Sequence, residues 1–194
     1  MILIFPPVAK PCEPPAGVAL LKSALNQAGH ACTVVDASVE GLLYLIRSVD
    51  RAEDSWSARA LKNRDQIIRD LKDPDLYRNM DRYHQRVYDL NHLLGMAVDR
   101  ERFRLTLSNY MDRHLLAVSS SDLLKSARTF EDNPFLPYFE QRLAPLIESE
   151  GCRHIGISLC YLNQALVSFA LAGWVRHRFP DRKLIMGGGL VSSW

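Results

Sequence analysis

The first 36 residues contain two short apolar runs separated by an amphipathic stretch. Residues 1–5 and 31–36 are mostly apolar or β-branched, which is typical of short strands that are buried on both faces. Between them, apolar side chains recur at helical spacing over residues 18–28, and Gly29 follows at a usual position for a helix end. This order of strand, helix and strand predicts a βαβ unit with parallel strands and a right-handed crossover.

The same pattern returns near the other end of the chain. A helix is predicted to end at Gly151, and two further strand-like runs at residues 154–158 and 183–186 flank a helix over residues 162–179. Four strand-like runs separated by helices predict the α/β class. We therefore expect a Rossmann-like open parallel sheet of about four or five strands.

The middle of the chain has a different character. Residues 47–104 carry 24 of the charged side chains, of both signs, which indicates a solvated helical surface. We therefore predict one domain formed by residues 1–41 and 131–194, with residues 42–130 as a helical insertion; a partner-docking surface on this insertion is the alternative. Within it, apolar residues step by four and three, which predicts a helix with one buried stripe: Leu76, Met80, Tyr83, Val87, Leu90 and Leu94.

Composition excludes several classes of protein. The chain is 47% hydrophobic and 24% charged with a net charge of +2, which gives no electrostatic footprint for nucleic acid or an anionic membrane. It contains no apolar run long enough to span a membrane. The four cysteines are widely spaced and form no Cys-x-x-Cys pair, which favours reduced thiols and a cytoplasmic protein.

Unusual residues cluster at the predicted ends of the strands. Five of the ten prolines fall within residues 6–15, after the first strand, and three consecutive glycines follow the last one. Ligands of open parallel sheets bind at the carboxyl ends of the strands, and either strand order considered, 3-2-1-4 or 2-1-3-4, leaves a cleft beside the first loop. We therefore expect a ligand cleft among four loops: residues 6–17, 36–41, 158–163 and 187–193.

Motifs of common enzymes are missing. The glycine run lacks the Gly-x-Gly-x-x-Gly spacing and no Walker sequence follows, so an independent nucleotide-binding enzyme is a weaker hypothesis. Ser158 has no nucleophile-elbow sequence around it, and His84 and His92 have no partners at zinc spacing. The sequence predicts no catalytic set.

Six segments together resemble a known domain type. In their order and strand context they are similar to the amino-terminal cobalamin-binding-type domain of radical S-adenosylmethionine (radical SAM) proteins. The resemblance covers roughly residues 1–41 and 134–194. The segments are residues 4–7, 14–21, 28–30, 34–36, 155–161 and 184–189.

This resemblance implies a domain that grips the corrin ring and the nucleotide tail of cobalamin. The matching positions in the first loop would shape the rim that faces the corrin. A serine and a tyrosine after the third strand would contact the tail or the corrin amides, and the triple glycine would let the tail pass close to the backbone. The implied cofactor-binding residues are Pro6, Pro7, Gly17, Ser158, Tyr161, Gly187, Gly188 and Gly189.

Two departures from the family pattern limit what the resemblance implies. Some cobalamin domains carry Asp-x-His-x-x-Gly after the first strand, and the histidine of this motif ligates cobalt. Here residues 36–41 have that spacing but follow the second strand, and Ser38 replaces the histidine. We therefore expect no histidine ligand from this domain. The chain also lacks the Cys-x-x-x-Cys-x-x-Cys loop of the iron–sulfur cluster.

These departures predict a fragment that catalyses nothing by itself. Its partner would be a downstream radical SAM domain of the same protein, absent from this chain, which would hold the iron–sulfur cluster and S-adenosylmethionine. The alternative is a protein-interaction or regulatory module on the same fold, with a vestigial cofactor slot and the insertion as docking surface.

Overall fold

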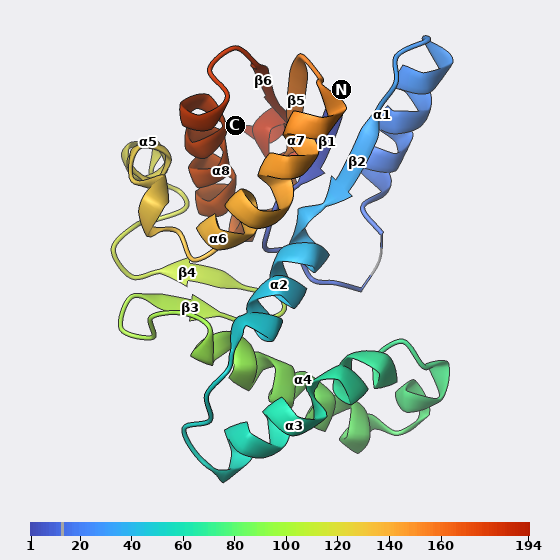
Figure 1. Cartoon of the computed structure of the whole chain (residues 1–194), viewed down its shortest axis with the longest axis vertical. Coiled ribbons are helices and arrows are strands. Elements are labelled where there is room, and N and C mark those ends of the chain that lie inside the picture. Colours follow the sequence, from blue (N-terminus) through green and yellow to red (C-terminus); the bar gives the residue numbers. More distant parts are fainter. Residues whose placement is uncertain (13) are drawn as a thin grey trace.

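A four-stranded parallel sheet forms the centre of the molecule. The computed structural model describes residues 1–12 and 14–194 (Figure 1). The strand order is β2-β1-β5-β6, and Ile4 in the central strand β1 lies opposite Val35 on one side and Ile157 on the other. This confirms the α/β prediction and selects the second of the two strand orders considered. The strands are β1 (Ile2–Phe5), β2 (Thr33–Asp36), β5 (His154–Ser158) and β6 (Lys183–Gly187).

Helices connect the strands and form most of the remaining structure. A short antiparallel hairpin pairs β3 (Phe103–Leu105) with β4 (Tyr110–Asp112). Among the described residues, no helix is both long and apolar enough to cross a membrane. The helices are α1 (Ala16–Gln27), α2 (Ala37–Ser48), α3 (Ser55–Asp70), α4 (Met80–Met96), α5 (Ser120–Arg128), α6 (Leu136–Tyr138), α7 (Ala144–Glu150), α8 (Ala165–Arg178) and α9 (Gly189–Ser193), with 3₁₀ turns at Pro74–Arg78, Phe130–Asp132 and Leu162–Gln164 and a π-helical turn at Phe139–Leu143.

The two faces of the sheet are covered unequally. The connection through α1 leads from β1 to β2, and the connection through α8 leads from β5 to β6, in the opposite direction across the sheet. Because such connections are right-handed, α1 and α8 lie on opposite faces. The α8 face belongs to the main core, which includes Ile4 and Trp174. On the other face, α1 buries only Val18, whereas Leu20 and Leu21 are 72% and 50% exposed. Phe5 packs with Val18 on this side and is buried, so the exposed apolar residues lie on α1 and not on the central strand.

The segment predicted as a helical insertion contains more than helices. In Figure 1 the hairpin and helices α3 and α4 lie beyond the carboxyl ends of the strands. The β3–β4 hairpin corrects the expectation of an all-helical segment; each strand has only three residues, too few for a clear alternating pattern. Helix α2 already begins at Ala37, and Leu42 on it lies in the main core. The predicted boundary at residue 42 therefore falls inside a core helix.

Helix α5 packs closely against α8. The Ser126 hydroxyl donates a hydrogen bond of 2.8 Å to the carbonyl oxygen of Leu166. A side chain at Gly173 would collide with the backbone of Ala127, so glycine permits this close approach. Helix α5 therefore belongs to the main body of the domain, although it lies in the predicted insertion.

The apolar stripe predicted along residues 76–94 is only partly buried. Leu76, Leu90 and Leu94 are buried, as predicted. Met80 is 56% exposed, so its predicted burial is wrong: it is the first residue of α4 and lies outside the main core. Tyr83 and Val87 are half-buried and line a cavity described below.

Candidate functional site

A cleft opens at the carboxyl ends of β1 and β5, where the strand order reverses. The connection from β1 leads to β2 on one side, whereas that from β5 leads to β6 on the other, so the two outgoing loops separate here. The cleft has a volume of about 490 Å³. Its lining comes from the end of β1, the first loop, the start of α1, the loop after β5 and the β3–β4 turn: Phe5, Val8, Ala9, Lys10, Cys12, Pro14, Pro15, Ala16, Gly17, Val18, Ser108, Ser158, Cys160, Tyr161 and Asn163.

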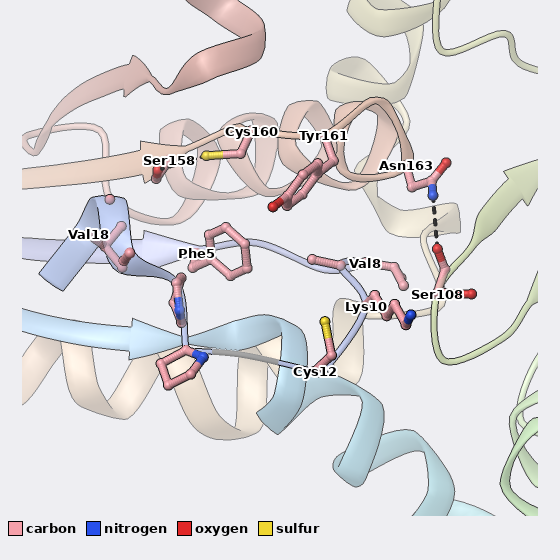
Figure 2. A pocket seen from close by; sticks show the side chains of 15 residues that line it. Phe5, Val8, Lys10, Cys12, Val18, Ser108, Ser158, Cys160, Tyr161 and Asn163 are labelled. Atoms are coloured by element: carbon pink, nitrogen blue, oxygen red, sulfur yellow. Dashed lines mark hydrogen bonds between the residues drawn. The ribbon is translucent and has the colours of Figure 1, made fainter. Parts of the chain in front are cut away.

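The lining is mostly apolar, with a few polar groups. Phe5 and Val18 are buried in its wall, and Figure 2 shows the Tyr161 ring reaching from the loop after β5 into the cleft. Tyr161 is 53% exposed, so its ring is accessible to a ligand. Lys10 is the one charged side chain among the described lining residues. Such a surface suits a largely apolar ligand with a few polar groups.

A buried glutamine fixes the two loops relative to each other. The side chain of Gln164 is fully buried, and its Nε2 donates a hydrogen bond of 2.7 Å to the carbonyl oxygen of Pro6. Its Oε1 accepts hydrogen bonds of 3.0 Å from the backbone N–H groups of Cys160 and Tyr161. One side chain thus satisfies backbone groups of both loops and holds the Tyr161 backbone beside the cleft.

The continuation of the first loop is held by Ser38. The Ser38 hydroxyl is buried; it accepts a hydrogen bond of 2.8 Å from the Ala9 N–H and donates one of 3.2 Å to the Ala9 carbonyl. Ser38 lies at the start of α2, where Asp36 accepts from the N–H of Val39 at 3.1 Å. Burial raises the pKa of Asp36, although backbone hydrogen bonds act in the opposite direction. The serine at the position compared above with histidine therefore positions the loop.

The β3–β4 turn reaches the cleft from the far side. The Asn163 side chain donates a hydrogen bond of 2.8 Å to the carbonyl oxygen of Ser108, as the dashed line in Figure 2 shows. Asn91 on α4 accepts from the Leu107 N–H at 2.9 Å, which fixes the same turn to the insertion. The insertion therefore contributes directly to the rim of the cleft.

Of the eight residues implied by the resemblance, three line the cleft and five lie outside its described lining. Gly17, Ser158 and Tyr161 line the cleft. Pro6 lies behind it and accepts the hydrogen bond from Gln164. Pro7 also lies outside the described lining, near Gly41 at the start of α2.

The three glycines after β6 lie outside the described lining of the cleft. Gly188 has a φ of +114°, and a side chain there would collide with the backbone of Leu159. The Leu159 N–H donates to the carbonyl of Gly187 at 2.7 Å, and the Leu159 carbonyl accepts from Leu190 at 3.2 Å. The expected close approach at the triple glycine is therefore made by the chain's own backbone.

Several residues at the cleft were not singled out from the sequence. Lys10, Cys12 and Cys160 lie on loops that were predicted to form the cleft. The rule that ligands bind at the carboxyl ends of parallel strands could therefore have identified them. Gln164 and Ser108 carried no such signal, because their roles depend on contacts distant in sequence. The Cys160 thiol lies 3.6 Å from the Ser158 hydroxyl.

The structure offers no further guide to a metal. Within residues 1–12 and 14–194, no group of three or more histidine, cysteine or acidic side chains is arranged to hold a metal ion.

Comparisons with protein-family models, curated proteins and solved structures find no match to this chain.

Proposed function

We propose that this chain is the amino-terminal, cobalamin-type cofactor-binding domain of a radical SAM iron–sulfur enzyme and is not catalytic by itself. The observation that carries the proposal is the cleft at the carboxyl ends of β1 and β5. Its position is the usual ligand position of an open parallel sheet. The segments that resemble the family run into this edge, and three of the eight residues the resemblance implies line the cleft.

The lining fits part of a cobalamin. A cobalamin is larger than the cleft of about 490 Å³, so the cleft would enclose one end of the cofactor and leave the rest outside. Phe5 and Val18 provide an apolar wall, and the Tyr161 ring can stack on a flat group. No histidine is among the described lining residues, so the proposal includes no imidazole ligand to cobalt.

Each binding residue would have a simple role. Gly17 at the start of α1 has no atom within 4 Å of where a side chain would begin, which leaves room for the ligand there. Ser158 and Tyr161 would donate hydrogen bonds to the amide groups or the tail. Pro6 and the glycines after β6 would act from behind by fixing the loops. A bound cobalamin would supply cobalt-centred chemistry to the neighbouring catalytic domain.

The proposed partner is a downstream radical SAM domain of the same protein, which would hold the iron–sulfur cluster and S-adenosylmethionine. Exposed apolar residues support such a partner, since Leu20 on α1 is 72% and Ile185 on β6 48% exposed. We also propose that the protein works in the cytoplasm, where its four free cysteines would remain reduced.

Retention of hydroxocobalamin tests the proposal. The purified chain is mixed with hydroxocobalamin and desalted, and the corrin absorbance that elutes with the protein is measured; we expect about one equivalent. Gly17→Phe would fill the cleft and abolish retention, whereas Ala24→Phe, on an exposed position of the same helix, would not. A wild-type chain that retains no corrin would overturn the proposal.

A second candidate is a protein-interaction or regulatory module. The observation that favours it is the exposed apolar surface of the insertion, where Met80 is 56% and Tyr88 61% exposed. In this case the cleft would be vestigial. The two candidates differ in the hydroxocobalamin experiment, because only the first expects retained corrin that Gly17→Phe removes.

A further inference from the structure

A second cavity lies next to the cleft, between the first loop and the insertion. It has a volume of about 330 Å³, and we call it the aromatic chamber. Lys10, Cys12 and Ser108 line both cavities and therefore form their common boundary. The residues that line the chamber are Lys10, Pro11, Cys12, Leu71, Tyr77, Tyr83, Val87, Asn91, Leu107 and Ser108.

The chamber leaves accessible two α4 residues that the sequence pattern predicted to be buried. Tyr83 and Val87 belong to the apolar stripe of α4, yet they are only half-buried because they face this cavity. Tyr77 lies against Tyr83 with ring centroids 5.3 Å apart and ring planes inclined by 39°. Two tyrosine rings and aliphatic side chains thus form one continuous wall.

The wall of the chamber is held in place without a ligand. The Tyr77 hydroxyl donates a hydrogen bond of 2.7 Å to the carbonyl oxygen of Leu71 at the end of α3. Asn91 accepts from the Leu107 N–H at 2.9 Å and holds the hairpin turn against α4. These polar groups are paired with the chain, and the cavity combines an aromatic and aliphatic wall with some accessible polar surface. Preformed cavities of this kind are typical of small-molecule sites.

The positive charge of Lys10, at the boundary between the two cavities, favours an anionic ligand. Lys10 is the one charged residue among the described residues that line either cavity. Its side chain is exposed, and Figure 2 draws it beside Ser108 at the end of the cleft nearest the insertion. An ammonium group next to a cavity with an aromatic wall suits a ligand with an aromatic body and one negative charge.

We propose that the aromatic chamber is a second small-molecule site, for a planar aromatic group that carries one negative charge, such as a carboxylate, sulfonate or phosphate. The aromatic body packs against Tyr83 and Val87, and the anionic group lies at Lys10. The volume of about 330 Å³ is at the lower end for ligand pockets and limits the aromatic body to about two rings. This site does not depend on what occupies the sheet-edge cleft.

Binding of 5-(dimethylamino)naphthalene-1-sulfonate, a fluorescent aromatic sulfonate with two fused rings, tests the proposal. The wild-type chain should bind one equivalent saturably, with an increase in fluorescence. Val87→Trp fills the chamber and should weaken binding about tenfold or more, whereas Val118→Trp, at a position 74% exposed, should leave it unchanged. Lys10→Gln should weaken binding about threefold and reduce its salt dependence, and Lys22→Gln on exposed α1 should do neither.

One further measurement distinguishes the two cavities, and a second tests whether the dye lies at the boundary that they share. Gly17→Phe fills the sheet-edge cleft and should leave dye binding intact, so loss of binding in this variant together with normal binding by Val87→Trp would overturn the proposal. In the wild-type chain, bound dye should slow alkylation of the exposed Cys12 thiol several-fold, and an unchanged rate at saturation would contradict the proposal. Absence of saturable binding by the wild-type chain, or equal binding by Val87→Trp and Val118→Trp, would also overturn it. Hydroxocobalamin retention is measured separately, so the failure of one proposal is distinguishable from the failure of the other.

Discussion

The side chain of Gln164 donates a hydrogen bond of 2.7 Å to the carbonyl oxygen of Pro6, although the two residues are 158 positions apart in the chain. This bond joins the loop after β1 to the start of α8. The same side chain accepts from the N–H groups of Cys160 and Tyr161. One buried amide therefore joins two of the loops that form the cleft.

Replacing Gln164 by leucine should destabilise the fold by about 2–4 kcal/mol, because the buried carbonyl of Pro6 and two partly buried N–H groups would lose their partner. Chemical denaturation followed by circular dichroism measures this change. Gln141→Leu, at an exposed position, is the matched control and should change stability by less than about 0.5 kcal/mol. Equal stability of the two variants would show that Gln164 does not hold the loops.

Ser38→Ala should destabilise the fold by about 1–3 kcal/mol, since the Ala9 N–H and carbonyl would both lose their partner in a buried environment. Hydrogen exchange should also become faster in the peptide that contains Ala9. Ser23→Ala, at an exposed position of α1, serves as control and should change neither quantity. Unchanged exchange at Ala9 in the Ser38 variant would contradict the assignment.

Gly188→Ala should cost about 2 kcal/mol or more, because the residue has a positive φ and the new methyl group would meet the backbone of Leu159. The neighbouring variant Gly189→Ala is a close control, since no atom lies within 4 Å of the added carbon there. Its stability should stay within about 0.5 kcal/mol of the wild type. Thermal unfolding of both variants measures the difference, and similar midpoints would argue against a close backbone approach.

The ion pair between α3 and α4 should give a pH-dependent contribution to stability. Asp70 accepts a hydrogen bond from Gln66 at 2.6 Å and one from Arg86 at 2.8 Å, and these two partners lower the pKa of Asp70 below 3.8. A carboxyl group whose pKa is lowered by folding stabilises the fold above its unfolded pKa, and this contribution is lost as the pH falls through the folded pKa.

Asp70→Asn should therefore destabilise the protein by about 1 kcal/mol at pH 7, and the effect should shrink at and below pH 3. Urea denaturation at several pH values measures this dependence. Asp75→Asn removes a highly exposed ion pair with Arg78 and should have little effect at any pH. A loss from Asp70→Asn that is independent of pH would show that packing, not charge, is responsible.

The sequence allowed the sheet to be predicted because each of its strands is a short apolar run between helices. Runs of this kind require burial on both faces, which only a covered parallel sheet provides. Gly29 and Gly151 marked the ends of α1 and α7 because both have a positive φ, at +80° and +56°, which favours glycine. Local physical chemistry was sufficient for these elements.

The remaining features depend on contacts distant in sequence. A lone glutamine at the start of α8 does not indicate that its partner is Pro6. Three consecutive glycines predict a close approach, but the pattern does not say whether a ligand or Leu159 fills the space. The partial burial of Tyr83 on α4 was likewise not predictable, because it depends on how the first loop lies over the cavity that they both line.

Strand β6 ends the sheet, and Ile185 on it is 48% exposed. Among the described residues, no strand pairs with its outer side. A free edge of this kind can accept one more strand from another polypeptide, with main-chain hydrogen bonds that require no particular sequence. A strand added at this edge would extend the sheet from four strands to five and would cover Gly187 and Lys183 at the two ends of β6 with a neighbouring backbone.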